Sequence, residues 1–314
     1  SRVSGTMLLQ YGKLMQQDKR IPCSSFLPLA DRLTWNNWME RMAAERLERK
    51  ASQVLELFRQ ANNWEETFWR MLSAGFGIRV NAGLFEQVAA SLPIRLLYRH
   101  QHSVQQLEAL LMGQANLLLK KMEDPYPLLL QRDFHFFQKK YQLTGISRQP
   151  AFLRMRPAAF PTIRLSQLAV LVHQSTRLFS QILEIKEDKL LQNLLLVTAS
   201  GYWDNHYRFD EPAIQQPKNI GKQMVNAVFI NTIIPVLYAY GSYKKENRFR
   251  EKAFSWLCNI QPEDNHLIKQ WEQWNIPLVS AMDTQALIEL TNYYCTNKQC
   301  LSCAVGNKIM KSYV

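Results

Sequence analysis

Long stretches without glycine or proline most constrain what this chain can fold into. The stretch Leu29–Ala61 contains neither residue, and its apolar side chains recur at helical spacing. On its polar side, Glu45 and Arg49 stand four residues apart in the order that stabilises a helix. The pattern predicts one long helix.

The rest of the chain gives further helix signals. Asn63 and Ser103 resemble helix caps, and Asp124–Pro127 breaks one helix and begins another toward Tyr141. Later helices are predicted near residues 162–183, 188–199, 218–240, 246–258, 263–274 and 283–295. Only Ile78–Val80 is strand-like, and Asn81 is expected to cap a short helix. The prediction is an all-α, irregular multi-helix domain without a regular repeat, spanning residues 1–314 with a possible subdivision at the loop 144–161.

Composition excludes several classes of protein. With 47% hydrophobic and 20% charged residues, the chain is neither disordered nor of low complexity. No apolar run approaches the ~20 residues that span a bilayer, and the N-terminus shows no secretory signal. The expectation is a soluble, cytoplasmic protein without a membrane partner.

Charge is unevenly distributed along the chain. The formal net charge is +12, yet no Asp or Glu occurs between Phe134 and Leu183. The basic residues of this acid-free window are Lys139, Lys140, Arg148, Arg154, Arg156, Arg164 and Arg177. One interpretation is a surface for nucleic acid, whose phosphates dominate affinity. The other is that these cations pair with carboxylates elsewhere in the chain or on another domain.

The segment around Pro161 sharpens the first interpretation. A helix beginning at Pro161 and Thr162 presents free N–H groups that suit an anion, and Arg164 falls in its first turn. A cation in the first turn interacts unfavourably with the helix dipole unless a negatively charged group lies beside it. We expect Arg154, Arg156 and Arg164 to form one patch at this helix end. The candidate residues for binding nucleic acid or another anion are Lys139, Lys140, Arg148, Arg154, Arg156, Thr162 and Arg164.

Searches for catalytic motifs give no candidate. Gly221-Lys222 lacks the glycine and hydroxyl residue of a P-loop. Ser200, Asp204 and His206 lie in one short segment, whereas catalytic trios normally converge from distant segments. Aromatic packing is the better interpretation of this segment. No catalytic residue is assigned, and the chain alone is not expected to be an enzyme.

Three of the five cysteines lie close together near the C-terminus. Cys295, Cys300 and Cys303 have the spacing C-x4-C-x2-C, which resembles ligation of zinc or an iron–sulfur cluster. A fourth ligand would have to come from Cys258, His266 or Cys23. The alternative is a set of reduced, buried thiols without metal.

Several segments together resemble a known family. They are RMRPAAFPTIRLSQLA (Arg154–Ala169), ERLERK (Glu45–Lys50), WEETF (Trp64–Phe68), ALLMGQA (Ala109–Ala115), SGYWDNHY (Ser200–Tyr207), NIGKQMVNAVFINTIIPVLYAYG (Asn219–Gly241) and YYCTNKQCLSCAVGN (Tyr293–Asn307). Across essentially its whole length the chain resembles an uncharacterised bacterial family, domain of unknown function 2851. The resemblance implies that this is the C-terminal helical portion, and that longer members carry an N-terminal domain similar to restriction-endonuclease-type nucleases.

Three functional hypotheses follow. The first is a basic helical module that binds DNA or RNA beside a nuclease-like domain. The second is a scaffold that docks that N-terminal domain or another protein partner. The third, an independent enzyme, ranks last because no catalytic constellation is present.

Overall fold

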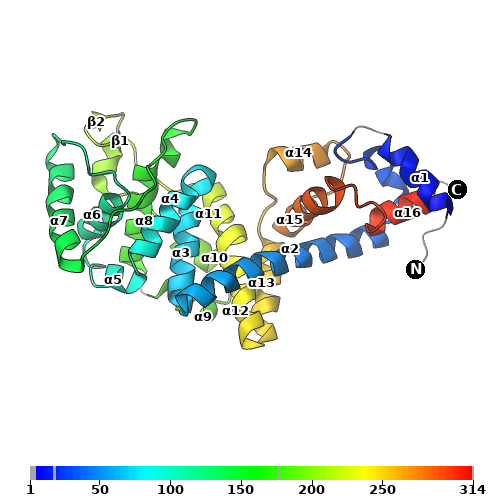
Figure 1. Cartoon of the computed structure of the whole chain (residues 1–314), viewed down its shortest axis with the longest axis horizontal. Helices are drawn as coiled ribbons and strands as arrows, with labels where there is room; N and C mark the ends of the chain where they lie inside the picture. The colour runs from blue at the N-terminus through cyan, green and yellow to red at the C-terminus, as the bar shows by residue number, and fades with distance from the viewer. Residues whose placement is uncertain (1–4, 17–18, 176, 313–314) are drawn as a thin grey trace. The chain divides into compact units, whose positions relative to one another are not determined.

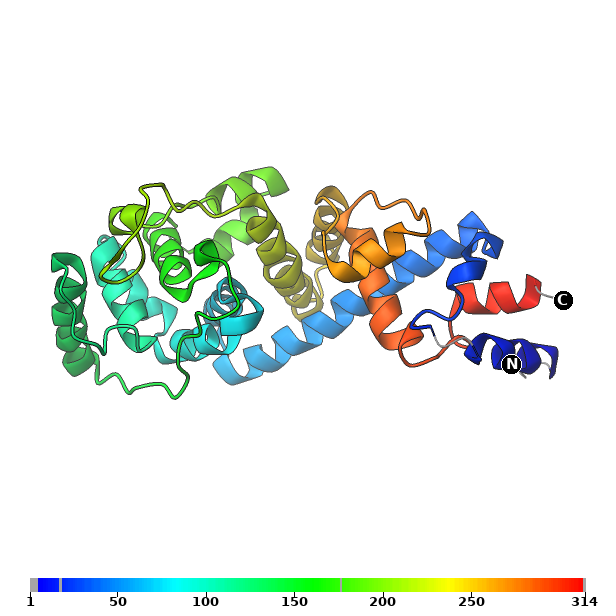
Figure 2. The ribbon, with the colours of Figure 1, turned by 90° about the horizontal axis from the view of Figure 1, so that it is seen from above.

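The computed structural model describes residues 5–16, 19–175 and 177–312, and these residues are mostly helical, with one short pair of strands (Figures 1 and 2). The all-α prediction is therefore confirmed. The chain divides into two compact units, one formed by residues 1–53 and 250–314 and the other by residues 54–249. The loop at which a subdivision was expected, residues 144–161, lies inside the second unit.

Unit 1 combines the two ends of the chain. Its elements are α1 (Gly5–Met15), the 3-10 helix η1 (Ser24–Leu29), α14 (His266–Glu272), α15 (Ala281–Glu289), the π-helix η5 (Leu290–Cys295) and α16 (Ala304–Ser312). Two helices cross the unit boundaries along the chain: α2 (Arg32–Ala61) and α13 (Asn247–Asn259). The long helix predicted from the Gly-free and Pro-free stretch is α2.

A charged cluster joins α2 to α15 within unit 1. Arg46 and Arg49 both donate to the carboxylate of Glu289, whose side chain is almost completely buried. Lys50 and Arg46 also donate to the Gln285 side-chain oxygen. Burial lowers the pKa of Lys50 to about 7. The ERLERK segment thus positions α15 rather than covering a solvated face.

Unit 2 contains the central part of the chain. Its helices and strands are α3 (Trp64–Phe76), α4 (Ile78–Ser91), α5 (Ile94–Tyr98), α6 (Val104–Gln114), α7 (Pro125–Tyr141), the 3-10 helix η2 (Pro157–Ala159), α8 (Pro161–Gln174), α9 (Leu178–Glu184), α10 (Asp188–Leu194), the 3-10 helix η3 (Gly201–Asn205), β1 (His206–Arg208), β2 (Glu211–Pro212), α11 (Lys222–Val228), the π-helix η4 (Phe229–Ile233) and α12 (Ile234–Lys244). The two strands form one antiparallel pair.

Helix α8 lies at the centre of this unit. It packs against α6 and α3, and α7 covers the opposite side of α6 in both views (Figures 1 and 2). Its residues from Pro161 to Val172 are all buried. The polar side chains among them therefore form their hydrogen bonds inside the protein. The loop before α8 therefore ends at a helix that is held rigidly in the core.

Local capping signals placed the starts of α3 and α6 correctly. Asn63 accepts a hydrogen bond from the Glu66 N–H, and Ser103 accepts one from the Gln106 N–H. The expectations for Ile78–Val80 and Asn81 were wrong. Ile78–Val80 is the first turn of α4, and Asn81 is buried inside that helix instead of capping it.

The run Lys222–Lys244 is helical throughout and, by length and composition, could cross a membrane. This helix is the one predicted near residues 218–240, but the expectation that no apolar run approaches the length that spans a bilayer is wrong for it. In the structure 78% of its most apolar window is buried inside the protein, as expected for a core helix. Gly75 of α3 permits the close approach of this run, because a Cβ there would lie 2.9 Å from the Thr232 hydroxyl oxygen.

Candidate nucleic-acid interface

The side-chain amides of Asn81 in α4 and of Asn116, just after α6, hold the loop between α7 and α8. Asn81 donates to the Ala151 carbonyl and accepts from the Ala151 N–H, both at 2.9 Å. Asn116 donates to the carbonyls of Ile146 and Arg148, at 3.1 and 3.2 Å. The loop thus has a defined path without being part of any helix or sheet.

Replacing Asn81 by Ala is expected to free this loop. The substitution leaves the Ala151 N–H and C=O without partners, at a cost of about 1–3 kcal/mol. Trypsin should then cleave after Arg154 faster than in the unsubstituted protein, as followed by mass spectrometry. Gln149→Ala is the matched control, because the exposed Gln149 side chain makes no hydrogen bond within the described residues. Equal cleavage rates in the two variants would contradict this role of Asn81.

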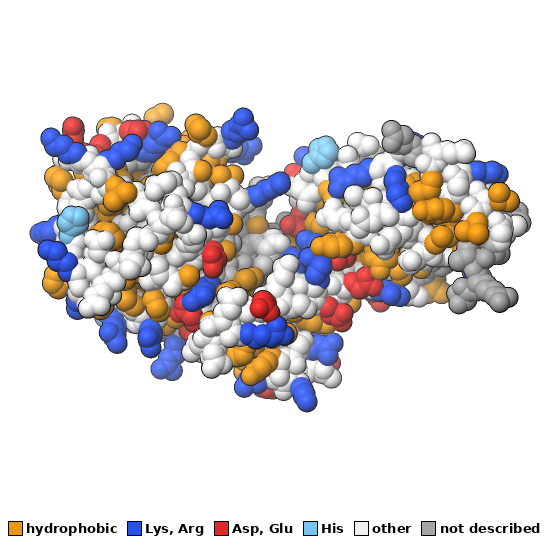
Figure 3. Space-filling model, viewed as in Figure 1, with side chains coloured by type: hydrophobic (Ala, Val, Ile, Leu, Met, Phe, Trp, Pro, Cys, Tyr) orange, Lys and Arg blue, Asp and Glu red, His pale blue; other side chains and the backbone are white. Residues whose placement is uncertain are grey.

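Five of the seven candidate anion-binding residues are exposed on or beside this loop. They are Lys139, Lys140, Arg148, Arg154 and Arg156. None of the five forms an ion pair with a carboxylate of the described residues. Figure 3 shows Lys and Arg side chains gathered along the upper edge of unit 2, with few acidic ones among them. The sequence left open that these cations pair with carboxylates of this chain. For these five residues, no such pairing is observed within the described part of the chain.

The other two candidates do not lie on this surface. Arg164 is only 8% exposed, and its guanidinium donates to the Gln167 side chain at 2.9 Å. Burial lowers the pKa of Arg164 to about 10, and no carboxylate of the described residues pairs with it. Thr162 is buried as well, and its hydroxyl donates to the Tyr207 carbonyl. Thr162 thus connects α8 to β1, whereas Arg164 bonds within α8, and neither side chain faces solvent.

Sequence reasoning missed Arg208 of β1, which lies close to the loop. Its guanidinium lies 4.8 Å from the ring centre of Phe152 and 5.2 Å from that of Phe160. These rings come from the loop and from the residue before α8, so Arg208 adds a cation to the aromatic part of the surface. Its only described carboxylate contact is Glu211 at 3.6 Å. Arg208 lies next to acidic residues in the sequence, so no charge signal could have found it.

The segment Ser200–Tyr207 forms no catalytic trio. His206 faces Asp124, with Nε2 3.4 Å from the carboxylate, and stacks on Tyr202 at 4.2 Å between ring centres. Tyr202 in turn donates to Asp124. Ser200 contributes its backbone N–H to the Ser166 hydroxyl. The segment packs through its aromatic rings, as the sequence predicts.

A buried carboxylate, Glu108, lies at the centre of unit 2. It accepts hydrogen bonds from the hydroxyls of Tyr126 and Ser166 and from the Trp203 indole N–H. Burial raises the pKa of Glu108 well above its usual range. Since Glu108 and Trp203 are fully buried, this group supports the fold and is out of reach of a substrate.

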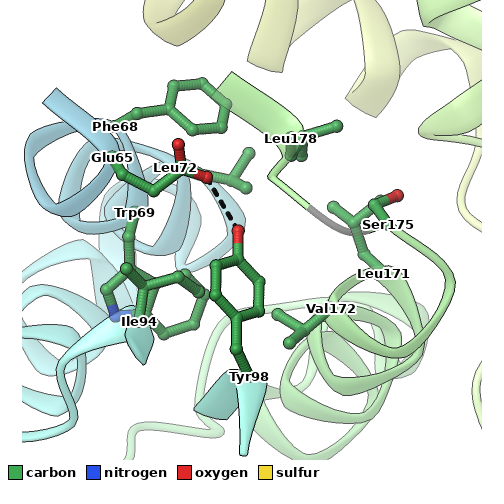
Figure 4. Close-up of a pocket in the computed structure, with 10 residues that line it drawn as sticks. All are labelled: Glu65, Phe68, Trp69, Leu72, Ile94, Tyr98, Leu171, Val172, Ser175 and Leu178. Carbon is green, nitrogen blue, oxygen red and sulfur yellow. Dashed lines mark hydrogen bonds between the residues drawn. The ribbon is translucent and has the colours of Figure 1, made fainter. Parts of the chain in front are cut away.

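A small apolar cavity lies between α3, α5 and α8 (Figure 4). Glu65 and Tyr98 close one side of it through a hydrogen bond of 2.7 Å. Its volume of about 20 Å³ holds little more than one water molecule. The cavity is therefore no ligand site.

The cysteines near the C-terminus are buried, and Cys23 lies in the same hydrophobic cluster as Cys295 and Cys303. Cys258 and His266, the other two suggested fourth ligands, are exposed. All five cysteines are free thiols. Among residues 5–16, 19–175 and 177–312, no group of three or more His, Cys, Asp or Glu can hold a metal ion as the side chains stand.

The fold and the surface define an irregular all-helical protein with a basic loop held on a helical core. Residues 1–266 match the model of the family described as "Protein of unknown function (DUF2851)", and the chain belongs to that family. The match ends before the cysteine segment, whereas the resemblance was expected to extend over essentially the whole chain. No curated protein and no solved structure matches this sequence.

Proposed function

We propose that unit 2 binds nucleic acid through the loop between α7 and α8. The observation that carries the proposal is a set of five exposed cations, three on this fixed loop and two in the last turn of α7, that pair with no carboxylate of the described residues. Unit 2 as a whole has 23 Lys and Arg against 15 Asp and Glu, a net charge of +8. Phosphates are the abundant polyanions that such a surface attracts.

Aromatic side chains next to these cations suit a single strand or an exposed base. Phe152 and Phe160 contact each other edge to face at 5.1 Å, and Arg208 covers both rings. Lys140 lies 5.2 Å from the Tyr141 ring. Cations interleaved with aromatic rings are typical of proteins that bind single strands by phosphate contact and base stacking. We also propose that this module accompanies the nuclease-like domain of longer relatives, and that this domain is the enzyme.

Removing the five exposed cations is expected to weaken binding strongly. The variant carries Ala at Lys139, Lys140, Arg148, Arg154 and Arg156. Its affinity for random single-stranded and double-stranded DNA and RNA should fall, and the slope of log K against log salt should decrease by about 0.9 for each lost contact with duplex phosphate. Fluorescence anisotropy over a salt series measures both quantities.

The matched control removes the same charge elsewhere in unit 2. It carries Ala at the exposed residues Lys120, Lys121, Lys222, Lys244 and Lys245. If binding depends on the loop surface, the control keeps most of its affinity and its salt slope. Equal losses in the two variants would contradict a local site and indicate attraction by net charge alone.

A groove in unit 1 favours the scaffold as a second candidate function. Leu27, Trp35 and Met39 line one side of this groove of about 820 Å³, and Trp274 and Ile276 line the other. Apolar grooves of this kind accept a segment of a protein partner. The test is binding of a separately produced N-terminal domain of a longer relative. Binding that is lost in Trp35→Ala and kept in the five-cation variant would support this function instead.

A further inference from the structure

Three aromatic rings lie in a row beside the loop between α7 and α8. Phe152 and Phe160 meet edge to face with 5.1 Å between their ring centres, and Phe160 meets Tyr207 edge to face at 6.5 Å. Tyr207 belongs to β1, and its carbonyl accepts a hydrogen bond from the Thr162 hydroxyl at the start of α8. All three rings are partly exposed. We call these three rings, which the fold brings together from two distant segments, the aromatic row.

A cation lies over every ring of the aromatic row. The Arg208 guanidinium lies 4.8 Å from the ring centre of Phe152 and 5.2 Å from that of Phe160. The Lys218 ammonium lies 4.3 Å from the ring centre of Tyr207 and is held there by hydrogen bonds to two backbone carbonyls. Positive charge and ring surface therefore occur together. Proteins that bind single strands use this combination to stack bases and to bind their phosphates.

The Arg208 side chain is open to a phosphate. It is 41% exposed, and its one ion pair with a carboxylate of the described residues is with Glu211, at 3.6 Å. The Glu211 side chain is itself 63% exposed, and exposed pairs of this kind are weak. A phosphate oxygen can therefore replace the Glu211 carboxylate beside the guanidinium.

The aromatic row suits unpaired bases better than a duplex. In a duplex the bases stack on one another and show only their edges in the grooves. In a single strand the base faces are open for stacking on protein rings. Leu153, next to Phe152 in the chain, is 82% exposed and extends the apolar surface. Because Asn81 holds this part of the loop through both backbone groups of Ala151, the surface keeps a defined position.

We infer that the aromatic row is a base-binding site that makes unit 2 prefer single-stranded to double-stranded nucleic acid. Bases stack against the exposed parts of Phe152 and Phe160, and Arg208 binds the adjoining phosphate. The five exposed cations attract either form through its phosphate charge, so the rings and Arg208 determine the preference. This inference rests on the nucleic-acid binding proposed for unit 2.

Replacing Phe152 by Leu tests the preference, because leucine keeps an apolar side chain but removes the ring. Fluorescence anisotropy of the whole chain is measured with one labelled strand of mixed sequence, as DNA and as RNA, and with the same strand paired to its complement. The unsubstituted protein should bind the single strand more tightly than the duplex. Phe152→Leu should lose about tenfold in affinity for the single strand and keep its affinity for the duplex.

Tyr243→Leu is the matched control for the loss of a ring. Tyr243 is 53% exposed and has the Lys244 ammonium 5.9 Å from its ring centre, but it belongs to α12 and not to the aromatic row. This variant should keep both affinities. If Phe152 only supported the path of the loop, Phe152→Leu would lose affinity for the single strand and the duplex alike, which would contradict base stacking on this ring.

A second variant keeps the test valid if Phe152→Leu does not fold. Glu211 is exposed, so Glu211→Gln should leave the fold intact. Without this carboxylate, Arg208 should bind phosphate more strongly, so affinity for the single strand should rise and the slope of log K against log salt should steepen by up to about 0.7. Glu184→Gln makes the same charge change at an exposed residue of α9 and is the control. A rise no larger than that of the control would contradict the role of Arg208.

The inference and the proposed function fail in different ways. If the unsubstituted protein binds neither form, the function proposed for unit 2 is wrong, and this inference is wrong with it. If it binds both forms equally well, or if the ratio of the two affinities is unchanged in Phe152→Leu, the five cations bind nucleic acid without selecting single strands. That result would overturn the inference and leave the proposed function standing.

Discussion

Replacing Glu289 by Ala is expected to destabilise unit 1 by about 3–5 kcal/mol, because two partly buried cations lose the buried carboxylate that pairs with them. Arg46 and Arg49 both bond to Glu289, and Lys50 lies beside them on the same helix. Removing the acid leaves the two guanidiniums, with Lys50 beside them, without this carboxylate; Glu263 is the other carboxylate that acts on Arg46 and Lys50. Hydrogen exchange of α15 amides, measured by mass spectrometry, reports the loss locally.

Asp264→Ala is the control for this prediction. Asp264 forms an ion pair of similar length with Lys269 in unit 1, at 3.0 Å, but both side chains are more than half exposed. Exposed pairs contribute only about 0–1 kcal/mol, so exchange in α15 should hardly change. If the two variants exchange at the same rate, the cluster of Glu289 does not hold α15 in place.

Replacing Glu108 by Ala is expected to destabilise unit 2 by at least 3 kcal/mol. Three donors lose their acceptor, from the buried Ser166 and Trp203 and the partly buried Tyr126, at about 1–3 kcal/mol each. The missing side chain also leaves a cavity. Denaturant unfolding followed by circular dichroism measures the change.

Glu108→Gln separates hydrogen bonding from charge at this position. Glutamine keeps the size and one acceptor oxygen, so this variant should be much more stable than Glu108→Ala. Because burial raises the pKa of Glu108, the native state holds its proton above the pH at which the unfolded chain loses it. The unsubstituted protein should therefore lose stability as pH rises above about 4.3, and Glu108→Gln should lose less. A steeper loss in the glutamine variant would contradict the raised pKa.

The sequence by itself determined the helices and many of their ends. The absence of Gly and Pro between Leu29 and Ala61 gave α2, and Asn63 and Ser103 marked the starts of α3 and α6. Pro125 and Pro161 occupy the first residues of α7 and α8, as predicted. These features depend on residues within one or two turns of each other, so a single sequence contains them.

Which side chains are buried, and which residues they bond to, were decided only by the tertiary structure. Arg164 stands in the first turn of α8, as predicted, yet α8 is buried and its guanidinium bonds to Gln167 instead of facing solvent. Asn81 holds a loop 70 residues away, and Glu108 meets Tyr126, Ser166 and Trp203 from three other segments. The neighbourhood of Cys23 and the C-terminal cysteines depends on the packing of η1 on α16. Which helix faces meet is set by packing between segments far apart in sequence, and local periodicity carries no information about that choice.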